Sequence, residues 1–150
     1  MGIIKDKTIQ HLIERIEKVE KEKQPLWGKM TSTQMLAHCS ASIKMAYGDF
    51  PVKLRLTPFK SAIWKFLIVD LLPFRKHLPA PPEINVGKKL RNIGDFETEK
   101  QQLIVQLNRM KDTPSDYDFS PHPIFRKMGP RSWGRIAVKH LDHHLRQFGV

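Results

Sequence analysis

The sequence contains little of several features that commonly point to a fold or a function. Its 150 residues include one cysteine, Cys39, so no disulfide can form within the chain, which suits a reducing compartment. No apolar run approaches the roughly 20 residues that a membrane-spanning helix needs. Residues 1–6 lack the apolar stretch and small-residue cleavage site of a signal peptide, so we expect a cytoplasmic protein.

Several common catalytic motifs are also missing from the sequence. It contains no glycine-rich phosphate loop, no Gly-x-Ser-x-Gly elbow, no His-Glu-x-x-His pair and no recognisable nucleic-acid-binding motif. Many of the frequent routes to hydrolysis, nucleotide binding and base recognition are therefore excluded, and any chemistry must come from other residues.

Negative charge is scarce: 15 Asp and Glu residues stand against 26 Lys and Arg residues, giving a net charge of +11. The excess is concentrated in residues 53–91, with nine basic and two acidic side chains, whereas residues 5–23 carry six and five. Such a segment is either an ordinary solvated surface or a patch for nucleic acid, an anionic membrane or an acidic small molecule.

Hydrophobic residues make up 40% of the chain and recur mostly at helical spacing, which indicates a globular all-helical protein. We predict a helix over residues 6–23, ended by Pro25, and a second from Thr31 to Tyr47 that begins with a Thr31–Gln34 capping box. Two further helices are predicted, from Asp95 to about residue 111 and over residues 130–148.

Prolines divide residues 49–94 into shorter pieces. Residues 60–72 are predicted to form a buried helix; the alternative is a membrane-surface helix, for which Trp64, Phe66 and basic flanks are suitable. Its apolar run could also meet a second subunit in a homodimer. Residues 74–94 are predicted to be a long ordered loop or crossover, and residues 112–129 to be irregular. The fold predicted for the single domain 1–150 is an all-α, up-down four-helix bundle with a long crossover and an extra helix.

Three histidines are candidates for a metal site. His140 and His144 lie four residues apart, on one helical face that also carries apolar side chains and Gln147. His38 lies on the second predicted helix, on a face of mixed polarity, and could meet the pair inside a bundle. A lone histidine such as His38 is more often a hydrogen-bonded core residue than a ligand, and the four-residue pair alone is a weak signal, so the prediction depends on the combination of the three. His143 is expected at the edge of the face, and Asp142 points about 200° away from His140, too far round to act as a base there.

The segments around these histidines resemble a known superfamily. Residues 27–38, His140-Leu-Asp-His143-His144-Leu-Arg-Gln147-Phe, His122-Pro-Ile-Phe and residues 128–134 are similar to the DinB-like (YfiT-like) four-helix metalloproteins, and within them to a branch of unknown function. The resemblance implies that His38, His140 and His144 are the metal ligands. It also implies a metal-dependent hydrolase, a thiol S-transferase or a thiol-dependent isomerase.

Three neutral imidazoles leave coordination positions open, as in catalytic sites. We predict a divalent transition metal, zinc or nickel first, with copper and iron also compatible. If the protein is a thiol S-transferase, we also expect a low-molecular-weight thiol as a cofactor. Gln147, Ser42 and Gln34 are candidate acceptors for the second ring nitrogens. Cys39 is expected to be a small buried hydrophobe.

The first functional hypothesis is an enzyme acting on a small-molecule substrate, which requires a cavity beside the histidines. The alternatives are a basic, non-enzymatic protein that binds nucleic acid or an anionic membrane surface, and a protein whose metal is purely structural.

Overall fold

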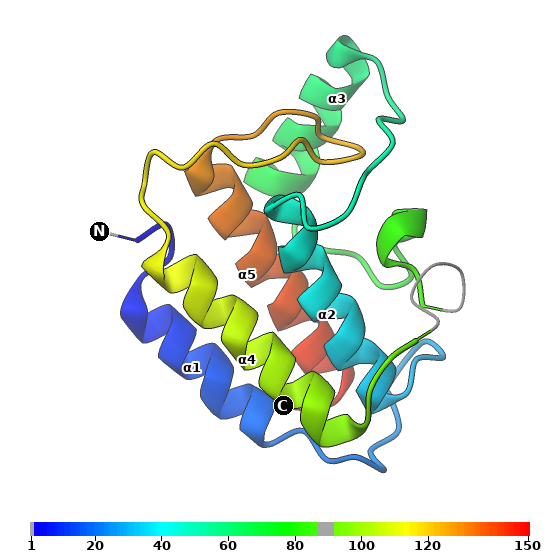
Figure 1. Cartoon of the computed structure of the whole chain (residues 1–150). Helices are drawn as coiled ribbons and strands as arrows, with labels where there is room; N and C mark the ends of the chain where they lie inside the picture. The colour runs from blue at the N-terminus through cyan, green and yellow to red at the C-terminus, as the bar shows by residue number, and fades with distance from the viewer. Residues whose placement is uncertain (1, 87–91) are drawn as a thin grey trace.

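Helices form every named element of the computed structural model, which describes residues 2–86 and 92–150 (Figure 1). Four long helices pack together: α1 (Asp6–Glu17), α2 (Ser32–Ala46), α4 (Phe96–Asp112) and α5 (Pro130–Gln147). Helix α3 (Pro58–Lys65) continues into the π-helix η1 (Phe66–Leu71), and η2 (Pro82–Ile84) is a 3-10 turn. Only isolated β-bridges occur among the described residues, so the prediction of an all-α fold is confirmed. Residues 87–91, part of the predicted loop 74–94, lie outside the described residues.

The long connection between α2 and α4 decides the order of the helices. Both α1 and α2 contact α4 and α5. In Figure 1, α1 and α5 run downward, whereas α2 and α4 both run upward. The crossover through α3, η1 and η2 returns the chain to the end where α2 began. Helices α1 and α2 are therefore antiparallel, as are α4 and α5, but α2 and α4, which the crossover connects, run parallel. This order departs from a strict up-down bundle.

Most predicted helix boundaries agree with the structure, but α1 is shorter than predicted. The capping box at Thr31 is present, Asp95 caps α4 by accepting a hydrogen bond from the Thr98 amide, and α5 begins with Pro130. Helix α1 ends at Glu17 rather than near residue 23. Lys100 of α4 donates hydrogen bonds from Nζ to the carbonyl oxygens of Glu17 and Val19, at 3.3 and 3.1 Å. A tertiary contact thus binds the carbonyls at the helix end, well before the proline.

Two groups of buried apolar side chains share α2. The first fills the space between the four long helices and includes Ile16, Leu36 and Leu145. The second lies between α2, α5, η1 and residues 113–129 and includes Val69 and Trp133. Because α2 packs on both sides, most of its residues are buried, which explains the mixed face around His38. Cys39 is buried as predicted, and burial raises the pKa of its thiol.

Helix α3 lies on the outside of the molecule, contrary to the prediction of a buried helix. Ser61 is the only buried residue of α3, whereas Phe59, Ile63 and Trp64 are exposed. The following η1 packs against α5 and buries Val69. The prediction fails because the apolar stripe of α3 faces away from the bundle. None of the helices in the described part of the chain is long and apolar enough to cross a membrane.

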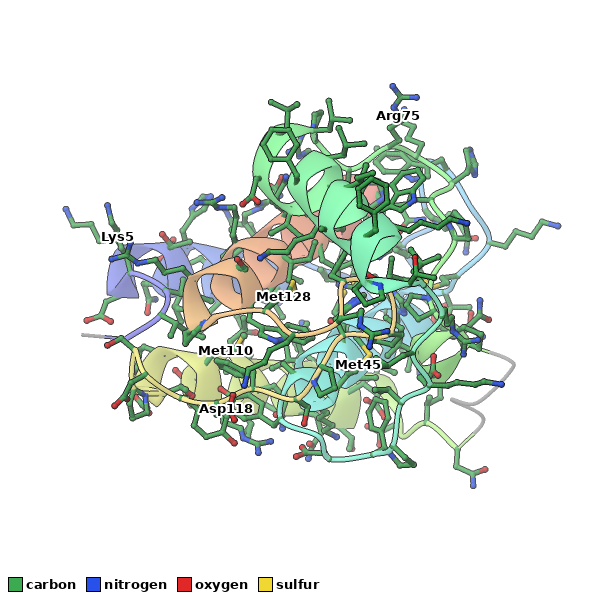
Figure 2. The ribbon with its side chains drawn as sticks, turned by 90° about the horizontal axis from the view of Figure 1, so that it is seen from above. Lys5, Met45, Arg75, Met110, Asp118 and Met128 are labelled. Carbon is green, nitrogen blue, oxygen red and sulfur yellow. The ribbon has the colours of Figure 1, made fainter. Side chains whose placement is uncertain are left out.

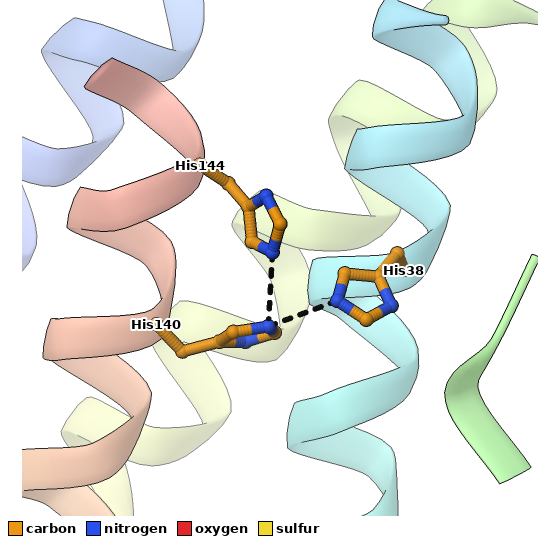
Figure 3. Close-up of side chains that lie close together, drawn as sticks. All are labelled: His38, His140 and His144. Carbon is orange, nitrogen blue, oxygen red and sulfur yellow. Dashed lines mark hydrogen bonds between the residues drawn. The ribbon is translucent and has the colours of Figure 1, made fainter. Parts of the chain in front are cut away.

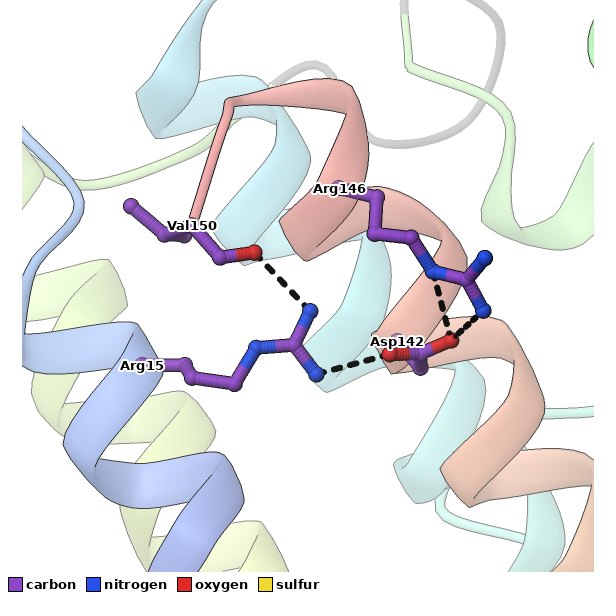
Figure 4. Close-up of polar contacts among 4 residues, drawn as sticks. All are labelled: Arg15, Asp142, Arg146 and Val150. Carbon is purple, nitrogen blue, oxygen red and sulfur yellow. Dashed lines mark hydrogen bonds and ion pairs between the residues drawn. The ribbon is translucent and has the colours of Figure 1, made fainter.

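An ion-pair network fastens the C-terminal end of α5 to α1 (Figure 4). Arg15 donates to Asp142 Oδ1 at 2.7 Å and to the Val150 carbonyl oxygen at 2.9 Å, and Arg146 also bonds Asp142. Burial alone would raise the pKa of Asp142, but the hydrogen bonds from Arg146 and Arg15 lower it overall. Asp142 therefore stays ionised and structural, in line with its predicted position away from His140.

Candidate metal centre

The three histidines selected from the sequence meet between α2 and α5 (Figure 3). His38 projects from α2 toward His140 and His144, which lie one turn apart on α5. The Nε2 atom of His140 lies 2.9 Å from His38 Nε2 and 3.1 Å from His144 Nε2. The three ligand nitrogens lie within 4.8 Å of one another, so the structure brings the predicted set together.

The other ring nitrogen of each histidine faces a hydrogen-bond acceptor. His38 Nδ1 donates to the Ile84 carbonyl oxygen at 2.6 Å, and His144 Nδ1 donates to Gln147 Oε1 at 2.7 Å. His140 Nδ1 lies 3.1 Å from Ser42 Oγ, whose own hydrogen is donated to the Cys39 carbonyl oxygen at 2.7 Å. Ser42 therefore accepts, and all three Nδ1 atoms carry the ring proton.

This assignment leaves three Nε2 lone pairs directed at one another. Neutral imidazole has a single N–H, so none of the close Nε2 contacts has a hydrogen to share, and the lone pairs repel unless a positive charge lies between them. Two nitrogens bonded to one ion at about 2.05 Å, 90–109° apart, would be separated by roughly 2.9–3.4 Å. The observed 2.9 and 3.1 Å fall in that range, and the donor set fits a transition metal.

Burial keeps the three rings neutral, the form that a metal requires. Desolvation lowers the pKa of His144 to about 3, with the nearby His38 adding to the shift. Desolvation likewise lowers the pKa of His38. For His140, desolvation and repulsion from the neighbouring histidines together lower the pKa well below its usual value. At neutral pH the cluster offers lone pairs rather than positive charges.

Gln147 joins the histidines to the segment before α2. Its Nε2 donates to the Trp27 carbonyl oxygen at 2.7 Å, which fixes its amide so that Oε1 accepts from His144. Gly28 has a positive φ of 80°, and a Cβ there would lie 2.8 Å from Gln147 Nε2. The Trp27–Gly28 turn therefore sets the position of a side chain that orients a candidate ligand.

The remaining sequence candidates occupy other positions. Gln34 serves the capping box, accepting from the Thr31 amide at 2.9 Å, so it does not support His38. Ser42, one turn after His38 on α2, contacts the ring of His140 instead. His143 lies at the edge of the cluster, where its ring packs edge-on against Trp27. The sequence did not point to the Ile84 and Trp27 carbonyl groups, because any residue type can supply a backbone acceptor. The one available signal was Gly28, a glycine directly after Trp27 that permits the turn there.

A cavity of about 670 Å³ adjoins the cluster, as the enzyme hypothesis requires. All three histidines line it, and most of the other lining side chains are apolar or aromatic. The bundle supplies one wall, including Trp133 and Ile136, and the crossover supplies the other, including Trp64, Ile68 and Phe74. A volume of this size is typical of small-molecule sites.

A further histidine, His122, is buried and lines the cavity outside the cluster. Its Nδ1 accepts hydrogen bonds from the amides of Ile124 and Phe125, at 3.0 and 3.3 Å, and its ring stacks on Phe125. Desolvation lowers its pKa to about 3. Its ring proton is therefore on Nε2, and it shapes the loop whose residues Ile124 and Phe125 also line the cavity.

Comparison with known proteins gives a family but no activity. No curated protein and no solved structure matches the chain. Residues 5–149 match the model of a family described as "Protein of unknown function (DUF1569)". This match spans the bundle, the crossover and all three clustered histidines, and the chain therefore belongs to the DUF1569 family.

Proposed function

We propose that the protein is a metal-dependent enzyme in which His38, His140 and His144 hold one divalent transition ion at the wall of the apolar cavity. The observation that carries the proposal is the direction of the ring nitrogens. Each Nδ1 faces an acceptor, and each Nε2 faces the common centre. This arrangement also supports the resemblance to the DinB-like metalloproteins, which stays a prediction.

The cavity favours a catalytic centre over a structural one. Structural zinc sites surround the ion with four protein ligands, whereas catalytic sites keep a position open. The described residues offer three histidines and no fourth His, Cys, Asp or Glu in the group. The cluster borders a space large enough for a substrate. Three imidazoles suit zinc and nickel, the two metals we expect first.

The residues of the chain have definable tasks in such a site. Ile84, Ser42 and Gln147 hold the three rings in the Nδ1–H form and so direct their lone pairs. The apolar walls exclude water and favour a small, largely apolar substrate. A divalent ion held by three neutral ligands would supply Lewis-acid activation of a water molecule or of a thiol. The first corresponds to a hydrolase and the second to a thiol S-transferase.

Elemental analysis of protein purified without an affinity tag tests the site. We expect about one zinc or nickel ion per chain, and loss of that ion in His38→Ala and in His144→Ala. The matched control is His11→Ala, because His11 is an exposed histidine of α1 outside the cluster. Wild-type protein that neither contains nor takes up a metal would overturn the proposal.

Activity assays then separate the two reaction types. Zinc- and nickel-loaded proteins would be screened against ester and amide substrates, and against electrophiles with a low-molecular-weight thiol present. Turnover that is lost on chelation and restored by the metal identifies the reaction. Metal binding without turnover, with stability lost on chelation, would assign the ion a structural role instead.

A further inference from the structure

The outer surface of the crossover gathers most of the exposed apolar side chains of the described chain. Ten large hydrophobic residues are exposed, and seven of them lie within residues 54–78: Leu54, Phe59, Ile63, Trp64, Phe66, Leu71 and Leu78. We call these seven residues the apolar platform. Figure 2, seen from above, shows α3 outside the bundle, with Arg75 on the same side of the molecule. Clustered exposure of this kind marks an interaction site.

Helical geometry places part of the platform opposite the bundle. At 100° per residue, Phe59, Ile63 and Phe66 fall within about 60° of one another, on a face roughly 140–160° from the buried Ser61. Their exposed fractions are 76%, 45% and 58%. The stripe therefore points away from the protein and has no partner within the described chain.

Polar contacts on the inner side hold this segment in place. Ser61 Oγ donates to the Ile124 carbonyl oxygen at 2.7 Å, and Asp70 forms an ion pair with Arg135. Lys139 Nζ donates to the carbonyl oxygens of Ile68, Val69 and Leu72, at 2.8, 3.1 and 2.6 Å, which caps the π-helix. These contacts hold α3 and η1 against α5 and the loop at Ile124. The outward face of the platform is therefore a fixed part of the folded surface.

The charge around the platform selects the kind of partner. Residues 53–78 contain six basic side chains and one acidic side chain. The acidic one, Asp70, is paired with Arg135, and one of the basic ones, Arg55, is paired with Glu83, so the segment keeps an excess of positive charge. Two copies meeting through this surface would bring like charges together. An anionic lipid surface complements both the charge and the exposed aromatic rings, since aromatic and basic side chains favour the membrane interface.

We propose that the apolar platform docks on an anionic membrane surface, from which the cavity takes its ligand. Trp64 and Leu78 belong both to the platform and to the cavity lining. The rim of the cavity therefore lies at the docking face. An apolar molecule dissolved in the bilayer would enter without crossing water. The docking does not depend on the metal, so it can be tested on chelated protein.

Co-sedimentation of the full chain with vesicles tests the proposal. We expect binding to phosphatidylcholine vesicles containing phosphatidylglycerol, weaker binding to phosphatidylcholine alone, and loss of binding at high salt. The double variant Phe59→Ser, Phe66→Ser should bind about tenfold more weakly. Replacing Lys60 with glutamine should cost about fivefold. Val105→Ser is the control, because Val105 is an exposed apolar residue on α4, outside the platform.

Three results would overturn the proposal. One is no binding to the anionic vesicles. Another is equal weakening by Val105→Ser. The third is a stable dimer, measured by light scattering, that the Phe59→Ser, Phe66→Ser variant dissociates and that binds no lipid; the platform would then be a subunit interface. Adding EDTA should leave vesicle binding unchanged, so failure of the metal proposal and failure of this one give different readouts.

Discussion

Replacing Gln147 with leucine should weaken metal binding without removing the site. The change deletes the acceptor of the His144 Nδ1–H and the donor to the Trp27 carbonyl, both at 2.7 Å. Loss of such a supporting contact typically lowers metal affinity 10- to 100-fold. That corresponds to about 1.4–2.7 kcal/mol. The three ligands remain, so one ion per chain should still bind at saturation.

A competition titration against a chromophoric chelator measures the change in zinc Kd. Gln106→Leu is the matched control, because Gln106 is also a buried glutamine but lies on α4, outside the cavity lining. Gln147→Leu leaves the buried His144 Nδ1–H without an acceptor, which should lower the free energy of unfolding by about 1–3 kcal/mol. Gln106→Leu should lower it less, because Gln106 accepts only from Arg109, which keeps its ion pair with Asp49. Only Gln147→Leu should change the Kd. An unchanged Kd in Gln147→Leu, or an equal change in both variants, would refute the orienting role of Gln147.

Three further predictions concern stability. Gly28→Ala should cost about 1–2 kcal/mol, because a Cβ would meet Gln147 Nε2 at 2.8 Å and the residue has a positive φ; thermal melts would show it, with a weaker zinc Kd. Zinc at about 100 times its Kd should stabilise the wild type by about 2.7 kcal/mol, which raises the Tm by roughly 5–10 °C, and should not raise that of His38→Ala. The third follows from the pKa of His122, about 3 when folded against about 6.5 when unfolded. The contribution of neutral His122 to the free energy of unfolding is complete above pH 6.5 and is lost as the pH falls toward 3. Between pH 7.5 and 5.0 the loss from His122 is about 2 kcal/mol. Urea denaturation of chelated His122→Asn, which keeps an acceptor for the two amides, should show a correspondingly smaller drop than chelated wild type.

The parts of the fold that depend on local chemistry could be predicted from the sequence. The capping box at Thr31, the Asp95 cap and the proline at the start of α5 each act within one helical turn, so neighbouring residues suffice to locate them. The His140 and His144 pair is also local, since a four-residue spacing places two side chains on one face. Predicting that these two histidines share a face required only that the segment be helical.

Features that depend on distant parts of the chain were missed or misjudged. Helix α1 ends early because Lys100, far away in sequence, binds the carbonyl oxygen of its last residue, Glu17, and that of Val19 just beyond it. The apolar run of α3 predicted a buried helix, yet nothing in the described chain covers Phe59 and Phe66, because the second apolar core is filled instead by η1 and residues 113–129. An apolar pattern shows that a face avoids water, but not which surface will cover it.

The sequence by itself determined the helices, the charge imbalance and the three histidines as a candidate set. Only the tertiary structure decided that His38 reaches the α5 pair, that Ile84, Ser42 and Gln147 direct the rings, and that a cavity lies beside them. The physical reason is that periodicity fixes the direction of a side chain about its own helix axis. The meeting of two faces is fixed by packing between helices far apart in the chain, and a backbone carbonyl acceptor such as that of Ile84 has no signature in sequence.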